Sequence, residues 1–231
     1  METAAASEAT MKAYRPRRGA QWIQKFMKDA KYRIVPSTDD GDCLFTAIKQ
    51  GLESRGKVVT IAELRAMLAS EANQALFEGY SLQYAMAKAE YEEVSAVTKR
   101  LTLESRTLKR RMKGANRKSQ MSIAEQAQEV TETLKHQNQV RLAAEEMMGE
   151  FDFMDGISSL QGMKAVIQSQ NYWGDTWAVS TLERLLNVKF IIFSKRAFDD
   201  GDRDNVLLCG QNNDEVLERR GRFDPDLYLL L

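Results

Sequence analysis

The sequence contains few of the residues that build disulfide frameworks and metal sites. Its 231 residues include two cysteines, Cys43 and Cys209, and a single histidine, His136. Two cysteines are too few for a disulfide framework, and with one histidine they cannot supply an ordinary zinc site. We therefore expect a free thiol in a reducing compartment, and we predict no metal and no cofactor.

Long apolar runs and a net charge are also lacking. No segment approaches the roughly 20 apolar residues of a membrane-spanning helix, and the N-terminus has no hydrophobic signal core. The 33 Lys and Arg residues balance 33 Asp and Glu residues, so the overall charge points to no partner. These absences predict a soluble, cytoplasmic protein with no membrane partner.

A short polar turn leads directly into a helical pattern at Cys43. Residues 39–42 read Asp-Asp-Gly-Asp, and the residues after Cys43 are mostly apolar and can anchor the first turns of a helix. The start of a helix offers unpaired N–H groups and the positive end of the helix dipole, which both favour a thiolate. We interpret Cys43 as a nucleophile. The alternative is that it is a small buried hydrophobic residue.

The chain outside residues 82–149 reads as short helices, loops and strands. Residues 1–20 lack sustained periodicity and predict a flexible N-terminal arm. A capping-box spacing from Thr60 to Glu63 predicts the start of a helix. Further helices are expected near residues 22–27, after Cys43, at 159–168 and after the loop at 171–177; strands are expected at 188–194, 205–209 and 227–231, with a turn at 224–226. Because the last strand reaches the end of the chain, we expect a longer polypeptide that continues beyond it.

Residues 82–149 have a different character. They contain no proline, and Ala, Glu, Lys, Arg, Gln and Met are abundant, which is a strongly helical composition. Apolar residues form a thin stripe at three-, four- and seven-residue spacings. We predict two long antiparallel helices that turn near residues 114–116 and form an inserted hairpin. The stripe consists of Val94, Val97, Leu101, Leu108, Met112, Ile123, Ala127, Val130 and Leu134.

The first of these helices carries a basic segment. From Lys99 to Lys118 there are nine Lys or Arg residues and one Glu, a net charge of +8. One interpretation is an electrostatic footprint for nucleic acid, an acidic partner or a membrane surface. The alternative is a solvated hairpin whose basic limb is offset by glutamates on the returning limb, because no aromatic residue is interleaved to stack on bases. These glutamates are Glu125, Glu129, Glu132, Glu145 and Glu146.

Three segments occur in an order that is informative. They are Asp40-Gly41-Asp42-Cys43-Leu44-Phe45, then Trp173-Gly174-Asp175, then the predicted strand at 188–193. This order resembles that of the ovarian tumour (OTU) family of cysteine proteases, most of which are deubiquitinases, and its character is that of OTU domains from large DNA viruses. The resemblance covers residues 32–81 and 151–231. It implies an α/β (α+β) cysteine-protease core over residues 21–231, with a small central β-sheet flanked by helices and interrupted by the hairpin at 82–149.

The resemblance also implies roles for individual residues. Cys43 matches the catalytic nucleophile, and Asp40 opens the loop whose backbone builds the oxyanion hole together with the Cys43 amide. Trp173 matches an aromatic residue near the active side of the sheet, where it would contact substrate; the alternative is a core tryptophan. The implied reaction is hydrolysis of ubiquitin isopeptide bonds through a thioester to Cys43, with ubiquitin or polyubiquitin as the partner.

One departure from the family pattern is serious. The family's general base is a histidine in a following strand, whereas the only histidine here is His136 in the predicted hairpin. A helical arm is a poor platform for a base that must reach the cysteine. Three explanations stay open. The polypeptide continues into a segment that supplies the histidine, or the site is degenerate and binds ubiquitin without cleaving it, or the basic arm is the functional surface and the core its platform.

Overall fold

The computed structural model describes residues 3–209 and 227–230. The chain divides into two compact units, and each is described by itself. We call Met1–Glu71 together with Ile167–Leu231 the cysteine unit, and Ala72–Val166 the hairpin unit. The cysteine unit contains α1 (Ala4–Ala13), α2 (Trp22–Met27), α3 (Cys43–Glu53), α4 (Ile61–Glu71), α8 (Thr176–Leu186), β1 (Val188–Phe193), α9 (Lys195–Asp199), β2 (Leu207–Cys209) and β3 (Leu227–Leu230).

The helices of the cysteine unit begin where local side chains satisfy their first N–H groups. At α4 the Thr60 N–H donates to the Glu63 carboxylate at 2.7 Å, and the Glu63 N–H donates to the Thr60 hydroxyl at 3.1 Å. This reciprocal capping box confirms the predicted start of the helix. At α8 the Asp175 carboxylate accepts from the Ala178 N–H at 2.8 Å, a single N-cap hydrogen bond.

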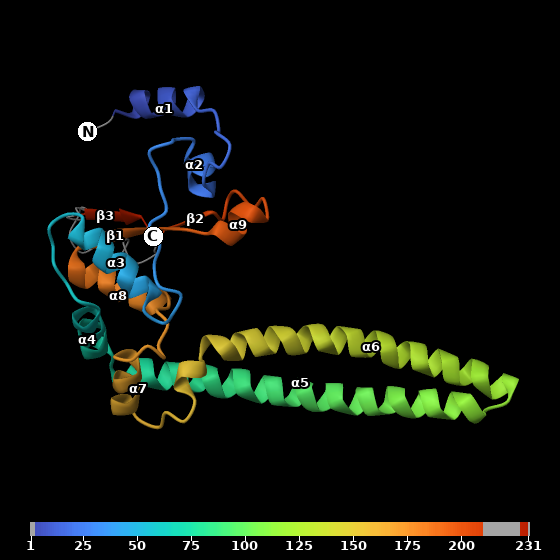
Figure 1. Cartoon of the computed structure of the whole chain (residues 1–231). Helices are drawn as coiled ribbons and strands as arrows, with labels where there is room; N and C mark the ends of the chain where they lie inside the picture. Colours follow the sequence, from blue (N-terminus) through green and yellow to red (C-terminus); the bar gives the residue numbers. More distant parts are fainter. Residues whose placement is uncertain (1–2, 210–226, 231) are drawn as a thin grey trace. The chain divides into compact units, whose positions relative to one another are not determined.

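A three-stranded sheet with the order β2-β1-β3 lies in the same unit. The pair β1 and β2 is antiparallel, with Ile192 opposite Leu208, and the pair β1 and β3 is parallel, with Phe190 opposite Leu229. Helix α8 contacts β1 and helix α3 contacts β3, so both helices lie against the sheet (Figure 1). The core here is fully enclosed, with side chains of at most 2% exposure. These include Phe45, Ile48, Leu182, Val188 and Phe190.

Aromatic side chains pack at the other end of β1. The ring of Phe26 in α2 meets the rings of Phe193 and Phe198 edge-on, at centroid distances of 6.0 and 6.4 Å. Trp22 lies 5.5 Å from Phe198 between ring centroids. These contacts join α2, which the helical spacing of Trp22, Ile23, Phe26 and Met27 predicts, to the strand and to α9.

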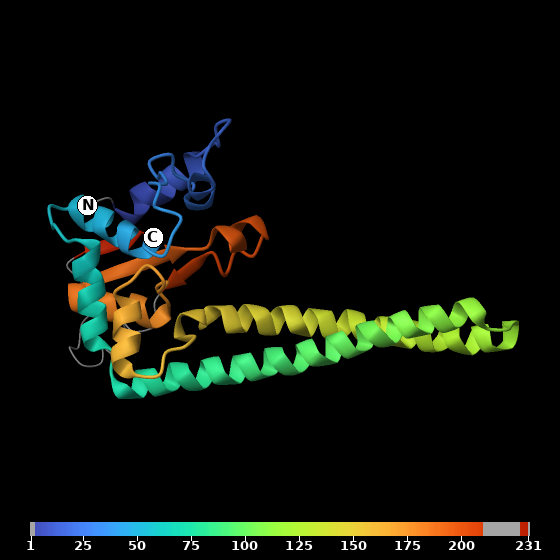
Figure 2. The ribbon, with the colours of Figure 1, turned by 60° about the horizontal axis from the view of Figure 1, so that its bottom comes forward.

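The hairpin unit contains two long helices, α5 (Gln74–Gly114) and α6 (Arg117–Glu150), followed by a 3₁₀ turn at Asp152–Met154 and the helix α7 (Leu160–Ile167), which ends at the unit boundary. Figures 1 and 2 show α5 and α6 side by side from the turn onward. The predicted stripe closes into a core formed by Leu101, Leu108, Ile123 and Val130, with Val97, Met112, Ala127 and Leu134 packed against it. Asn116 caps α6 by accepting from the Ser119 N–H at 3.0 Å. The two helices and their turn are therefore confirmed, although α5 begins at Gln74, before the expected start of the hairpin at residue 82.

The predicted fold class is wrong. The described residues are mostly helical, and their three strands have only six, three and four residues, which does not fit an α/β OTU cysteine-protease core with its central sheet. Short motifs define local turns and helix starts, whereas a sheet requires partners from distant segments, and the order of motifs does not determine those.

Two other expectations concern the ends of the chain. Within the expected arm at 1–20, residues Ala4–Ala13 form α1, which the Thr3 side chain caps and which buries no residue. The helix propensity of its residues and the Thr3 cap are sufficient to form α1. Because α1 has no apolar stripe, the hydrophobic periodicity of the sequence did not reveal it. The expected turn at 224–226 lies outside the described residues.

Candidate functional site

Cys43 is the first residue of α3, and its side chain is partly buried. The turn before it is held by two hydrogen bonds to Asp40. The Cys43 N–H donates to the Asp40 carbonyl at 3.0 Å, and the Asp42 N–H donates to the Asp40 carboxylate at 3.0 Å. The Cys43 amide, which the resemblance assigns to the oxyanion hole, is thus already bonded. The next amides, of Leu44 and Phe45, donate no hydrogen bond to any described residue, and they leave free donors in the first turn.

A second loop, between α7 and α8, lies directly against this turn. A Cβ added to Gly41 would lie 1.8 Å from the Gln170 carbonyl oxygen, so only glycine allows the two backbones to come this close. A Cβ added to Gly174 would lie 2.2 Å from Leu44 Cδ2. The Gln170 amide donates to the Asp42 carboxylate at 2.7 Å, across 128 residues of sequence. The two motifs singled out in the sequence, at 40–45 and 173–175, are therefore neighbours in space.

Arg65 of α4 joins both loops. Its side chain is only 3% exposed. Its Nε donates to Asp42 Oδ1 at 2.8 Å, and its Nη2 lies 2.7 Å from the same oxygen in the ion pair. Nη2 also donates to the Gly41 carbonyl at 2.7 Å and to the Tyr172 carbonyl at 3.2 Å, and Nη1 donates to the Ile167 carbonyl at 2.7 Å. The guanidinium lies 4.1 Å from the centre of the Phe45 ring. A buried charge with this many partners holds the Cys43 turn in one geometry.

The charge beside the cysteine is balanced by these contacts. Partial burial raises the pKa of the Asp42 carboxyl, but the hydrogen bonds from Gln170 and Arg65 and the charge of Arg65 outweigh it, and the pKa lies below its usual value. Asp42 is therefore a carboxylate at neutral pH. Because its charge is directed at Arg65, it opposes a thiolate on the adjacent Cys43 less than a free carboxylate would.

Tyr172 anchors the second loop and leaves its neighbour exposed. The Tyr172 ring is fully buried, and its hydroxyl donates to the Asp175 carboxylate at 2.8 Å. The same carboxylate caps α8. Trp173 is 58% exposed, so it is not the core tryptophan that was the alternative. An indole side chain held out from a fixed loop is suited to contact an apolar partner, and its contact with substrate stays a prediction.

The structure brings some of the predicted site residues together and separates others. Asp40 and Cys43 share the turn, and the Trp173 loop packs on it. His136 is exposed on α6 of the hairpin unit, whereas Cys43 belongs to the cysteine unit. The sequence reading missed Arg65, Gln170 and Tyr172. A signal for Arg65 existed, because it lies four residues after Ile61 and three before Leu68, on the apolar stripe of α4.

The described residues contain no metal site and no membrane-spanning helix. In residues 3–209 and 227–230, no group of three or more His, Cys, Asp and Glu side chains is arranged to hold a metal ion. In the same residues, no helix has both the length and the apolar character needed to cross a bilayer. No protein-family model, curated protein or solved structure matches the chain. Only the geometry of the site therefore bears on function.

Proposed function

We propose that the cysteine unit is a thiol-dependent isopeptidase that acts on ubiquitin or polyubiquitin, with Cys43 as the nucleophile. The observation that carries the proposal is the packing of the 39–43 turn against the 170–175 loop at the first turn of α3. Two motifs that are distant in sequence meet at the one cysteine that begins a helix. A cysteine that served only as a small core residue would not require a buried arginine to hold both loops around it.

The first turn of α3 favours the chemistry of a thiolate. Cys43 is its first residue, and a helix start presents N–H groups and the positive end of the helix dipole to a nucleophile at that position. The thiolate would attack the carbonyl carbon of the isopeptide bond and form an oxyanion. The N–H groups of Leu44 and Phe45, which donate to no described residue, would donate hydrogen bonds to it. The bond between the carbonyl carbon and the lysine nitrogen breaks, the amine leaves with a proton taken from water, and the carbonyl carbon stays bonded to Sγ as a thioester. Water then cleaves the thioester, releases a carboxylate and restores the thiol.

The exposed Trp173 supports a peptide-like substrate. It follows Tyr172, which is locked in the core, and precedes Gly174, which packs against Leu44 of α3. An aromatic side chain fixed in this way loses little entropy when it binds an extended chain. The C-terminal tail of ubiquitin is such a chain, and Trp173 would contact it near the scissile bond.

A second candidate is ubiquitin binding without hydrolysis. It is favoured by the location of the single histidine of the chain, which lies on α6 of the hairpin unit, so the cysteine unit contains no imidazole to act as a base. A thiolate can form at a helix start without an imidazole, but the leaving amine still needs a proton donor. The two candidates predict different products with a reactive ubiquitin.

The deciding experiment uses ubiquitin that carries a C-terminal electrophile. The proposal expects a covalent adduct with the wild-type chain that is lost in Cys43→Ala and kept in Cys209→Ala, the matched control. Saturable binding of unmodified ubiquitin with no adduct would select the second candidate. Neither adduct nor binding would reject both. The same assay with Trp173→Ala should slow adduct formation about tenfold or more if the indole contacts the tail.

A further inference from the structure

The far end of the hairpin has a charge unlike the rest of the chain. We call residues 105–124, which include the end of α5, the turn and the start of α6, the hairpin tip. The tip contains seven Lys or Arg residues, no Asp or Glu and no aromatic residue. The chain as a whole has no net charge, so the remainder outside the tip has a net charge of −7. The positive charge is therefore local to one end of a helical pair.

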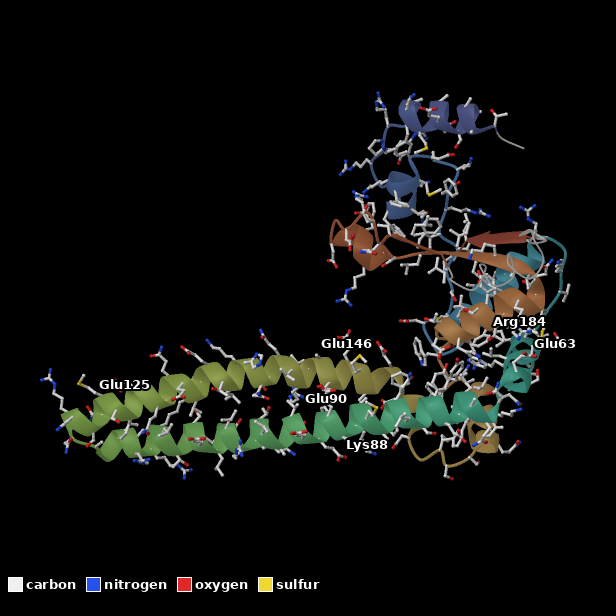
Figure 3. The ribbon with its side chains drawn as sticks, turned by 180° about the vertical axis from the view of Figure 1, so that it is seen from behind. Glu63, Lys88, Glu90, Glu125, Glu146 and Arg184 are labelled. Carbon is white, nitrogen blue, oxygen red and sulfur yellow. The ribbon has the colours of Figure 1, made fainter. Side chains whose placement is uncertain are left out.

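The seven basic side chains of the tip are available to a partner. All are exposed, and within the described chain none forms an ion pair. The basic residues that do form pairs in this unit lie elsewhere: Lys88 pairs with Asp155, and Arg141 pairs with Glu145 (Lys88 is labelled in Figure 3). The seven unpaired basic residues of the tip are Arg106, Lys109, Arg110, Arg111, Lys113, Arg117 and Lys118.

The glutamates of α6 do not neutralise the tip by direct contact. Among the described residues, Glu125, Glu129 and Glu132 form no ion pair with a basic side chain. The predicted offset of one limb by the other is thus not made by ion pairs at this end. Glu125, labelled in Figure 3, is the first acidic residue after the turn. Ten residues separate it from Gly114, the last residue of α5.

The spacing of the cations gives them a common direction. Arg106, Lys109, Arg110 and Lys113 follow an i, i+3, i+4, i+7 pattern, so they share one face of α5 over about 10 Å. The core residues Leu101 and Leu108 occupy the other side of that helix, against α6. The basic face is therefore directed away from the hairpin core.

Two further cations lie where a helix alone would not favour them. Arg117 and Lys118 are the first two residues of α6, and no acidic residue occurs in that first turn. The positive end of the helix dipole disfavours cations there and favours anions. A bound phosphate would offset both the dipole and these two side chains.

We propose that the hairpin tip binds the phosphate backbone of double-stranded nucleic acid without reading its sequence. Single strands are disfavoured because the tip has no aromatic side chain on which bases stack. Leu108 and Ile123 are buried in the hairpin core, and Met121 is the only large apolar side chain of the tip that is strongly exposed, at 67%. One such residue provides neither the apolar centre of a protein interface nor the apolar face that inserts into a membrane. Contacts to phosphates require only cations and polar donors, and the hydroxyls of Ser119 and Ser122 supply the latter.

The test uses the full chain and a fluorescent 20-base-pair DNA duplex of mixed sequence, with anisotropy measured from 50 to 200 mM salt. The variant replaces Arg106, Lys109, Arg110 and Lys113 with glutamine. The matched control replaces four exposed cations of the cysteine unit, Lys25, Lys28, Arg33 and Arg55, with glutamine. With about four phosphate contacts removed, the slope of log affinity against log salt should fall by about 3 to 4. Those four contacts alone correspond to a loss of about 150-fold over this salt range, so wild-type affinity should fall by at least that factor. The control should retain both the affinity and the slope.

Several outcomes would overturn the proposal. Equal affinity of the tip variant and the control for the duplex would show that the tip does not contact phosphates. Tighter binding of a single strand than of the duplex would contradict the duplex assignment. Binding to vesicles of phosphatidylserine and phosphatidylcholine with no binding to the duplex would identify a membrane surface instead. A second duplex of unrelated sequence should bind equally, and circular dichroism of each variant should match the wild type in helix content.

Discussion

Arg65→Ala should destabilise the cysteine unit strongly and specifically. The substitution removes a guanidinium that is only 3% exposed and that donates to the Asp42 carboxylate and to the carbonyls of Gly41, Ile167 and Tyr172. Asp42 would keep the hydrogen bond from Gln170, but it would lose its counter-charge while 14% exposed. The three carbonyls would lose a charged donor.

The size of the effect follows from these contacts. A hydrogen bond to a charged group contributes about 1.5–3 kcal/mol, but bonds from one guanidinium are not additive. Removal of one partner from a buried ion pair costs about 3–5 kcal/mol in measured cases, and partial hydration of Asp42 prevents a larger loss. We therefore expect the free energy of unfolding of the cysteine unit to fall by about 3–5 kcal/mol. At about 2–4 °C per kcal/mol for a chain of this size, the melting temperature should fall by roughly 6–20 °C.

The assay can report on the cysteine unit alone, because all three tryptophans, Trp22, Trp173 and Trp177, belong to it. Tryptophan fluorescence in urea and on heating would follow this unit, while far-ultraviolet circular dichroism is dominated by α5 and α6. Arg184→Ala is the matched control, because Arg184 is 50% exposed in its ion pair with Glu71 and should contribute less than about 1 kcal/mol (Figure 3). A fluorescence midpoint for Arg65→Ala equal to that of Arg184→Ala would refute the role assigned to Arg65.

Two further predictions concern the same turn. Because the pKa of Asp42 is held below its usual value in the folded chain, the stabilisation it provides is complete above about pH 4 and is lost as the pH falls through the folded-state pKa. The urea midpoint of the wild type should therefore fall more between pH 5 and pH 3 than that of Asp42→Asn, and an equal fall would contradict this. Gly41→Ala should lower the free energy of unfolding by about 1–3 kcal/mol, because its Cβ would meet the Gln170 carbonyl oxygen. Gly174→Ala should cost less, since its Cβ would meet the flexible Leu44 side chain, and a larger cost than for Gly41→Ala would be inconsistent with the packing.

Much of the local structure could be predicted from the sequence. The capping box at Thr60, the hairpin stripe and the helix that begins at Cys43 all depend on residues three or four apart, and α3, α4, α5 and α6 form as expected. The fold class could not be predicted in this way. The resemblance extended three short motifs to an α/β core, and the described chain has too little strand to form one.

The sequence by itself determined where α3, α4 and α6 start, where the hairpin turns and which cysteine begins a helix, because each of these depends on neighbours within one or two turns. Only the tertiary structure decided that the 39–43 turn and the 170–175 loop meet, and that Arg65 of α4 holds them together. Tertiary structure also decided that Trp173 is exposed and that the cations of the hairpin tip are unpaired within the described chain. The physical reason is that contacts across more than a hundred residues depend on the packing of whole helices, and a local pattern carries no record of that packing.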